Sequence, residues 1–289
     1  RASKPELKVR RALTALGGAL AGLGVWTLVL APLVAFTSRA FGMAAAARAF
    51  MWPSFDFRAA RTIANHGGVV MLGQIFWFLQ TQADIMVAGR ALTAGELGYY
   101  TTALFLAQLF VNKVVPPLNE VAFSAYARIQ DDPAAVANGF LTSVRVVMLL
   151  AIPFCFGLAA VSEPAIATML GAKWLPSAPL VTLLALAMPF MTLHVMFAPA
   201  TNAIGQPGIA TRSAILGALI MPAAFLIGVL SADARGIALA WLLGYPLLTA
   251  ITARWAFPAI GVTMRQVLAA LWPPLLAGGV MLGGVAAAD

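Results

Sequence analysis

Long apolar runs constrain this chain more than any other feature of its sequence. A transmembrane helix requires about 20 mostly apolar residues. Runs of that length, containing few charges, lie at 25–46, 64–88, 98–123, 135–160, 176–203, 209–230, 235–256 and 266–287. A shorter run, 12–22, fits the end of a further helix. None alternates apolar and polar residues as a barrel strand does. The sequence therefore predicts an all-α, polytopic transmembrane helix bundle, with eight or nine helices in this chain.

Composition supports the same class. The chain is 62% hydrophobic and 10% charged, with a mean hydropathy of +0.91, whereas soluble domains carry about 25% charged residues. Such a chain could not cover its surface in water, so we expect a multi-pass membrane protein. The lone Cys155 lies inside an apolar run and excludes an intrachain disulfide.

The chain has a net charge of +8, and most of its basic residues lie in the segments outside the apolar runs. If the N-terminal segment is cytoplasmic and each apolar run crosses the membrane once, three basic residues lie outside, namely Arg90, Lys173 and Arg235. Twelve are then cytoplasmic: Arg1, Lys4, Lys8, Arg10, Arg11, Arg48, Arg58, Arg61, Arg128, Arg212, Arg254 and Arg265. The positive-inside rule explains this excess, and contact with anionic lipid headgroups is the alternative. We expect no nucleic-acid partner.

One segment predicts a boundary within the chain. "RAFMWPSFDFRAAR", 48–61, combines a proline, three arginines and spaced aromatics, which is typical of a cytoplasmic linker on the membrane surface. It separates a helix pair in 1–47 from six helices in 62–257 and an additional helix in 258–289. The charged start, "RASKPELKVRR", lacks Met and an apolar core, so we expect it to be a charged loop and not a signal peptide. We expect a fragment of a longer chain.

Polar side chains concentrate in three consecutive runs. Each helical residue advances about 100°, so certain polar residues share a face. The candidates for binding a substrate or ion are Trp77, Gln80 and Asp84 on the first helix, Gln108, Asn112, Lys113, Asn119 and Glu120 on the second, and Arg145 on the third. Intramembrane charges usually face the bundle interior or a hydrated cavity. The alternative is that Asp84, Glu120 and Arg145 lie at the membrane interface and that Lys113 extends to it.

Asp84 is the most costly of these residues. An ionised Asp at a helix centre costs roughly 2.5–3.5 kcal/mol on insertion scales. We expect it to face a polar cavity and to bind a coupling ion, either Na⁺ or H⁺. Lys113 and Arg145 are the expected cationic anchors of this cavity.

Other chemistries lack support in the sequence. His66 and His194 are far apart and show no metal-ligand spacing, and His194 is interpreted as a core histidine with satisfied hydrogen bonds. No phosphate-binding G-x-x-x-x-G-K-[ST] motif and no Ser-His-Asp set is present. The sequence therefore predicts a protein that is not an enzyme, with no catalytic residues, no metal and no cofactor.

Five stretches in order resemble one family. "ADIMVAGRALTAGELGYYTTALFLAQL", with Asp84, Gly89, Leu97, Gly98 and either Tyr99 or Tyr100, resembles the central signature of bacterial polysaccharide flippases. "GLGVWTLV", "MLGAKWLPSAPLVTLLAL", "NAIGQPGIATR" and "ARGIALAWLLGYPLL" are similar to further segments of that family. These are the O-antigen and exopolysaccharide (Wzx-type) flippases of the multidrug/oligosaccharidyl-lipid/polysaccharide exporter superfamily.

The resemblance implies a fold and a function. It implies 12–14 helices in two lobes around a central cavity, of which this chain lacks the first few. It also implies flipping of undecaprenyl-diphosphate-linked oligosaccharide to the outer leaflet of the bacterial inner membrane by alternating access, with ion coupling. The expected partners are this lipid-linked substrate, membrane lipids and other polysaccharide-assembly proteins, in lipopolysaccharide or exopolysaccharide synthesis.

Other functions remain open from the sequence. A drug/cation antiporter or a lipid II flippase belongs to the same superfamily, although Lys113 and Arg145 disfavour cationic substrates. A non-transporting membrane assembly subunit is the alternative from another class. It would tolerate replacement of the charged residues.

Overall fold

The computed structural model describes residues 16–17, 22, 24, 26–46 and 57–286. The chain divides into two compact units, Arg1–Arg61 and Thr62–Asp289, and each is considered by itself. In the first unit, α2 spans Trp26–Ala46. The predicted helix end at 12–22 and the predicted linker at 48–56 lie mostly outside the described residues. The last residues of that linker, 57–61, are helical and begin α3.

The second unit is built from helices alone among its described residues. In chain order these are α3 (Phe57–Ala91), α4 (Ala94–Ala107), α5 (Leu109–Arg128), α6 (Pro133–Ala160), α7 (Ser162–Met169), the 3₁₀ helix η1 (Ala172–Ser177), α8 (Ala178–Ala203), α9 (Pro207–Ile260) and α10 (Met264–Ala286). Four described helical segments are long and apolar enough to cross a membrane, namely Pro133–Ala160, Ala172–Ala203, Pro207–Ile260 and Met264–Gly284. The predicted all-α transmembrane fold is confirmed.

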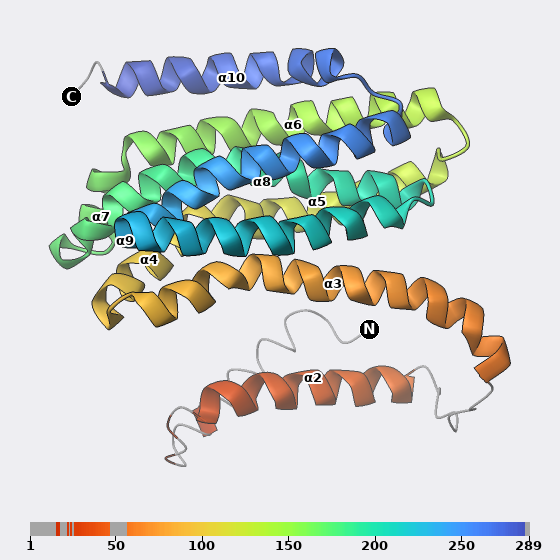
Figure 1. Ribbon diagram of the computed structural model, residues 1–289, viewed down its shortest axis with the longest axis horizontal. Helices are drawn as coiled ribbons and strands as arrows, with labels where there is room; N and C mark the ends of the chain where they lie inside the picture. The colour runs from red at the N-terminus through yellow and green to blue at the C-terminus, as the bar shows by residue number, and fades with distance from the viewer. Residues whose placement is uncertain (1–15, 18–21, 23, 25, 47–56, 287–289) are drawn as a thin grey trace. The chain divides into compact units, whose positions relative to one another are not determined.

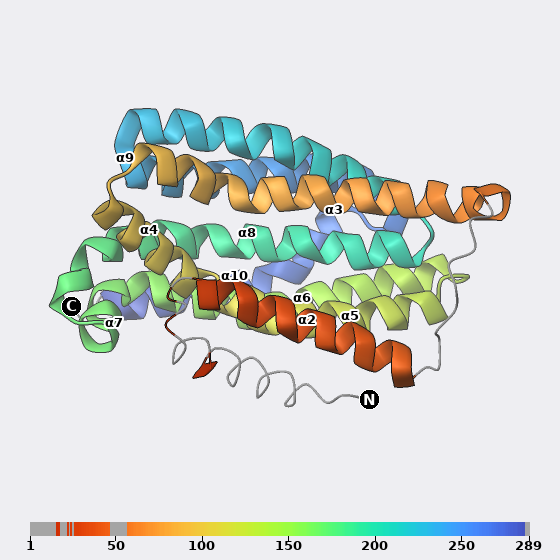
Figure 2. The same cartoon turned by 90° about the horizontal axis from the view of Figure 1, so that it is seen from below.

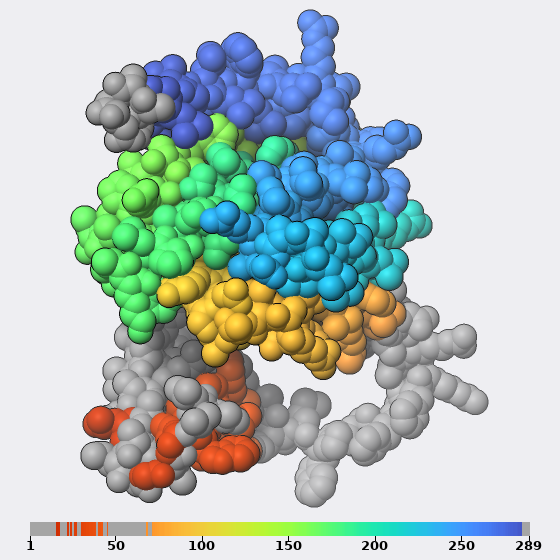
Figure 3. Space-filling model, turned by 60° about the vertical axis from the view of Figure 1, so that its left-hand side comes forward, coloured from red at the N-terminus to blue at the C-terminus, as the bar shows by residue number. Residues whose placement is uncertain are grey.

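The long helices of this unit run roughly side by side (Figures 1 and 2). The connections α5–α6, α8–α9 and α9–α10 lie at one end, which we call the basic end because Arg128, Arg212 and Arg265 are next to them. The α3–α4 connection lies at the opposite end, the far end. This alternation is what a bundle crossing a bilayer repeatedly requires. In Figure 3 the dark-blue atoms of α10 lie along one edge of the unit, against the green atoms of α6.

Helix α9 consists of two arms. Ala232 and Asp233 have non-helical backbone angles, and Asp233 has a φ of 50°. The arms, 207–231 and 234–260, match the predicted spans 209–230 and 235–256. They approach so closely that a Cβ on Gly228 would meet the backbone of Gly236. Glycine is therefore required where the arms touch.

The predicted span 98–123 was wrong in one respect, because two helices occupy it. Helix α4 ends and α5 begins at Gln108, whose φ is −80° and ψ −1°. Pro116 and Pro117 follow in α5, and each lacks the N–H that a helix uses. The carbonyls of Asn112 and Lys113 therefore lose their intrahelical donors. The short α7 and η1 were also not predicted.

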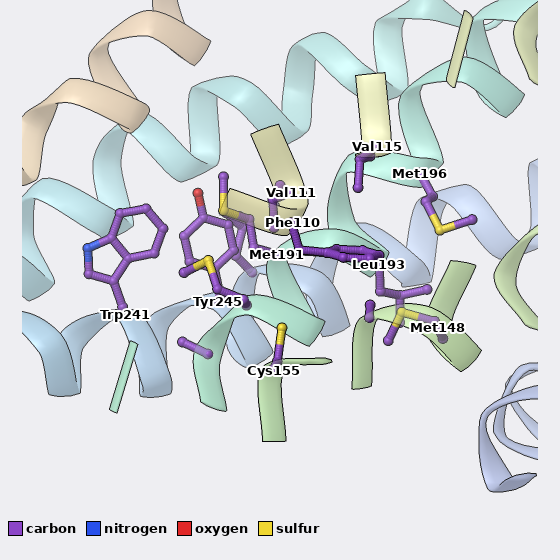
Figure 4. Packing of buried hydrophobic residues seen from close by; sticks show 14 of the residues in the cluster. Phe110, Val111, Val115, Met148, Cys155, Met191, Leu193, Met196, Trp241 and Tyr245 are labelled. Carbon is purple, nitrogen blue, oxygen red and sulfur yellow. The ribbon is translucent and has the colours of Figure 1, made fainter. Parts of the chain in front are cut away.

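The core lies among α5, α6, α8 and α9. Val111 and Val115 from α5 meet Met191 and Met196 from α8, and buried Cys155 comes from α6 (Figure 4). Helices α6 and α8 expose apolar side chains such as Leu150 and Phe190 on their outer surfaces. An apolar exterior suits contact with lipid tails.

The far end carries a charged capping box that should respond to pH. The Thr93 N–H and hydroxyl donate to the Glu96 carboxylate at 2.9 and 2.7 Å, and the Glu96 N–H donates to the Thr93 hydroxyl at 3.4 Å. These hydrogen bonds lower the pKa of Glu96. The carboxylate therefore stabilises the fold above the pKa that Glu96 has in the unfolded chain. That stabilisation is lost as the pH falls through the lowered pKa.

We expect Glu96→Gln to lower the unfolding temperature slightly at pH 7 and to make no difference at pH 3. The matched control is the neutral box of Thr263 and Gln266, in which the Thr263 N–H donates to Gln266 at 2.8 Å. Gln266→Ala should lower the unfolding temperature equally at both pH values. A Glu96→Gln effect that is also independent of pH would contradict the role of the charge.

Candidate functional site

A cavity of about 670 Å³ lies inside the second unit. Its wall comes from α3, α5, α8 and both arms of α9. Asn202 and Pro207, which flank the α8–α9 connection, line it, so the cavity extends to the basic end. Its volume falls within the range of about 300–1,000 Å³ typical of small-ligand sites.

The cavity wall combines apolar and polar side chains. Among the described residues that line it, Glu120 carries the only full charge. Neutral polar groups supply most of the remaining polarity, namely Gln74, Asn112, Asn119, His194, Thr201, Asn202, Thr211, Ser213 and Thr252. Asn119 donates to the Val195 carbonyl at 3.3 Å. The wall is therefore suited to a ligand rich in hydroxyl groups.

His194 and Trp77 lie together on this wall. Their rings are parallel within 7°, with centroids 6.3 Å apart. His194 is 5% exposed and its Nδ1 has no partner. Its Nε2 lies 3.4 Å from the Ser213 hydroxyl, which is 2.8 Å from the Thr252 hydroxyl. His194 is a buried core histidine as interpreted, but the expectation that its hydrogen bonds are satisfied holds only for Nε2, because Nδ1 has no partner.

Asp84 lies in a second feature, further along α3. It is fully buried, and the Tyr100 hydroxyl donates to its Oδ2 at 2.7 Å. The Trp241 indole N–H donates to the Tyr100 oxygen at 3.0 Å. We call Asp84, Tyr100 and Trp241 the carboxylate network. It joins α3, α4 and the second arm of α9 near the far end.

The carboxylate network leaves polar atoms unpaired. Asp84 Oδ1 has no partner, and neither has Oε1 of Gln80, whose amide donates to the Tyr245 hydroxyl at 3.4 Å. Gln80 and Asp84 are four residues apart and therefore share one face of α3. Buried polar atoms are normally satisfied. Two unpaired oxygens on one helix face fit a bound proton or a small cation. No group of three His, Cys, Asp or Glu able to hold a metal occurs in the described part of the chain.

Aromatic rings connect the network with the cavity. Tyr245 stacks on Trp241 with centroids 4.9 Å apart, and the two side chains are neighbours in Figure 4. The same Tyr245 meets His194 edge-on at 6.0 Å. His194 in turn faces Trp77 in the cavity wall. A continuous series of aromatic contacts thus runs from the carboxylate network to the cavity wall.

The structure divides the predicted site residues into separate groups. Trp77, Asn112, Asn119 and Glu120 line the cavity. Gln80 and Asp84 are buried behind it. Gln108, Lys113 and Arg145 are absent from its wall, and Lys113 and Arg145 are exposed. Helical spacing identified the shared faces but could not show which helix each face meets.

Several residues of this site were not predicted. Tyr100, Trp241 and Tyr245 complete the surroundings of Asp84, and Ser213 and Thr252 pair beside His194. A signal did exist for Trp241 and Tyr245. Aromatic residues with polar tips at i, i+4 spacing in an apolar helix usually seek a buried partner.

Comparisons with known proteins show the family and the fold of this chain. The sequence profile of the family described as polysaccharide biosynthesis protein matches residues 8–179, more than half of the chain. The succinoglycan biosynthesis transport protein ExoT of Rhizobium meliloti is 28% identical over 212 residues, covering 73% of this chain and 42% of ExoT. The lipopolysaccharide biosynthesis protein WzxC of Escherichia coli is 26% identical over 226 residues, covering 77% of this chain and 46% of WzxC.

A further relative and a solved structure extend the comparison. The probable low-salt glycan biosynthesis flippase Agl15 of Haloferax volcanii is 23% identical over 292 residues, covering 96% of this chain and 60% of Agl15. The chain thus spans 42–60% of the length of these relatives. The lipid II flippase MurJ, in its inward closed conformation, has a similar fold, with a TM-score of 0.69 at 14% identity over 98% of this chain and 66% of MurJ. The predicted resemblance is confirmed, and the chain belongs to the polysaccharide biosynthesis protein family.

Proposed function

We propose that the protein flips undecaprenyl-diphosphate-linked oligosaccharide from the cytoplasmic to the outer leaflet of the bacterial inner membrane during polysaccharide synthesis. The observation that carries this proposal is a cavity whose wall holds many neutral polar side chains, inside a bundle that exposes apolar side chains on its exterior. The names of ExoT, WzxC and Agl15 describe a transport protein, a lipopolysaccharide biosynthesis protein and a flippase. Other polysaccharide-assembly proteins are proposed partners.

The physical problem of flipping fits this arrangement. A saccharide diphosphate cannot cross roughly 30 Å of hydrocarbon unaided, because its polar groups would lose their water. The polyprenyl tail can remain in lipid throughout. The protein need only surround the polar head with hydrogen-bonding groups while its cavity opens first to one side and then to the other.

Asp84 is the proposed coupling residue. A proton or Na⁺ bound there would satisfy Oδ1, and binding would change the contacts that hold α3, α4 and α9 together at the far end. An ion can shift such an equilibrium only by its difference in affinity for the two states. Asp84 can provide this difference if the network opens when the cavity faces outward.

Lys113 is the proposed anchor for the diphosphate. It lies seven residues from Glu120 on α5, hence on the same side of the helix but nearer the far end. Its exposure leaves its ammonium group available to a phosphate. We expect Lys113→Ala to reduce the delivery of lipid-linked glycan to the outer surface at least about tenfold.

The test is rescue of cells that lack their own flippase. The full-length protein should restore glycan on the outer surface. Lys113→Ala should restore at least about tenfold less. Lys173→Ala, which replaces a matched exposed lysine at the far end, should restore it fully. Failure of the wild type at normal membrane levels would exclude this substrate.

A cation antiporter is the second candidate, because Glu120 is the charged residue on the cavity wall and Lys113 and Arg145 are not part of that wall. This function predicts that Glu120→Gln abolishes resistance to a cationic dye such as ethidium. A flippase for neutral saccharides should leave dye resistance unchanged.

A further inference from the structure

We infer that the wall formed by Trp77, His194 and Asn202 is a saccharide subsite, which holds a sugar ring of the transported lipid apart from its diphosphate. This inference rests on the proposed function and adds to it which part of the substrate meets which part of the protein.

The charge of the described part of the wall favours a neutral ligand over the diphosphate. Phosphate groups in protein sites are usually met by Arg, Lys, a metal ion or a helix N-terminus. Among the described residues of this wall no Arg or Lys is present, and Glu120 adds a negative charge. A diphosphate against this wall would be repelled, whereas a neutral saccharide would not.

Trp77 provides an aromatic surface. Its side chain is half-buried and lines the cavity, so part of the indole remains accessible. One face of a pyranose ring presents mainly C–H groups, which pack on an aromatic face while the hydroxyl groups point outward. His194, parallel to Trp77, keeps the indole fixed from one side. An aromatic ring held in place in this way loses little entropy on binding.

Polar groups around the ring can pair with the hydroxyls. His194 Nδ1 is without a partner although the residue is 95% buried, as its 5% exposure shows. Because Nδ1 itself has almost no accessible surface, the ring must turn slightly toward the cavity that His194 lines before a ligand hydroxyl can supply the missing hydrogen bond. The exposed amide of Asn202 adds donors and an acceptor at the mouth of the cavity. The chemical class that matches these groups is a neutral pyranose.

The test compares three lipids that differ only in whether they carry a sugar and in which sugar they carry. The probes are undecaprenyl diphosphate alone and undecaprenyl diphosphate carrying one glucose or one galactose, titrated into the purified full-length protein in detergent. The wild type should bind at least one sugar-bearing lipid about tenfold more tightly than the bare lipid. Trp77→Leu should remove this difference and leave the affinity for the bare lipid unchanged.

Matched variants separate recognition from folding. Trp272→Leu, which removes an exposed indole from α10, should retain the preference for the sugar. Asn202→Ala should weaken the preference, whereas Asn138→Ala on α6 should not. The inference would be overturned if Trp77→Leu weakened the binding of the bare and the sugar-bearing lipids equally. It would also be overturned if the wild type bound all three lipids with equal affinity.

The proposed function is tested separately, by the rescue of surface glycan in cells. If the wild type binds all three lipids equally but restores surface glycan in cells, flipping stands and the saccharide subsite is wrong. If it binds none of them and restores no glycan, both proposals are wrong.

Discussion

Asp84→Asn is expected to reduce delivery of lipid-linked glycan to the outer surface at least about tenfold, while the protein still reaches the membrane. The asparagine keeps the size of the side chain and can still accept the Tyr100 hydroxyl. It cannot become ionised, so it neither releases a proton nor offers a charged oxygen to Na⁺. The energetic difference between the two states of the bundle would then no longer depend on the ion.

Two further variants show whether the charge or the hydrogen bond matters. Tyr100→Phe removes the donor to Asp84 and leaves the carboxyl group in place. We expect it to retain transport but to shift its dependence on pH or Na⁺. Asp84→Asn should lose that dependence altogether. Transport by Asp84→Asn at the wild-type rate, with unchanged ion dependence, would remove Asp84 from the coupling mechanism.

Gly228→Leu is expected to destabilise the protein by about 3 kcal/mol, at the upper end of the usual cost of overpacking. A Cβ at this position would meet the carbonyl group of Gly236, and a backbone cannot move aside as the end of a flexible side chain can. The two arms of α9 would separate. Tyr245 and Trp241 would then move away from α3 and α4.

Thermal stability in detergent, followed by size-exclusion chromatography after heating, measures this effect. The control is Gly208→Leu in the same helix, where an added Cβ meets nothing within 4 Å. It should change the melting temperature little. Equal melting temperatures for the wild type and Gly228→Leu would mean that the arms of α9 are not packed as described.

The helices themselves were largely predictable from the sequence. The apolar runs at 135–160, 176–203 and 266–287 correspond to α6, α8 and α10 within a few residues. Bilayer thickness fixes the length of each run, so hydropathy alone identifies it. The break at Gln108 was not predictable in this way, because both sides of it are equally apolar and helical.

The candidate site was predictable only in part. Helical spacing placed Trp77, Gln80 and Asp84 on one face of α3, and the three are indeed turned into the bundle or its cavity. Their partners come from distant parts of the chain, since the bond from Trp241 to Tyr100 joins residues 141 positions apart. Such pairing is set by packing between helices, which the periodicity of one helix does not specify.

The same limit applies to the charges. Lys113 and Arg145 were expected to line the cavity because intramembrane charges usually face a polar interior. The structure exposes both side chains instead. Position along a helix gave their depth, but whether a face meets the cavity depends on the neighbours of α5 and α6.

The most direct test of the account is flipping by the purified full-length protein in sealed vesicles. A fluorescent undecaprenyl-diphosphate-linked saccharide would be placed in one leaflet, and its arrival in the other followed by quenching, with an imposed Na⁺ or H⁺ gradient. The account predicts transfer that one of these gradients accelerates in the wild type but not in Asp84→Asn. Transfer no faster than in protein-free vesicles, under either gradient, would contradict it.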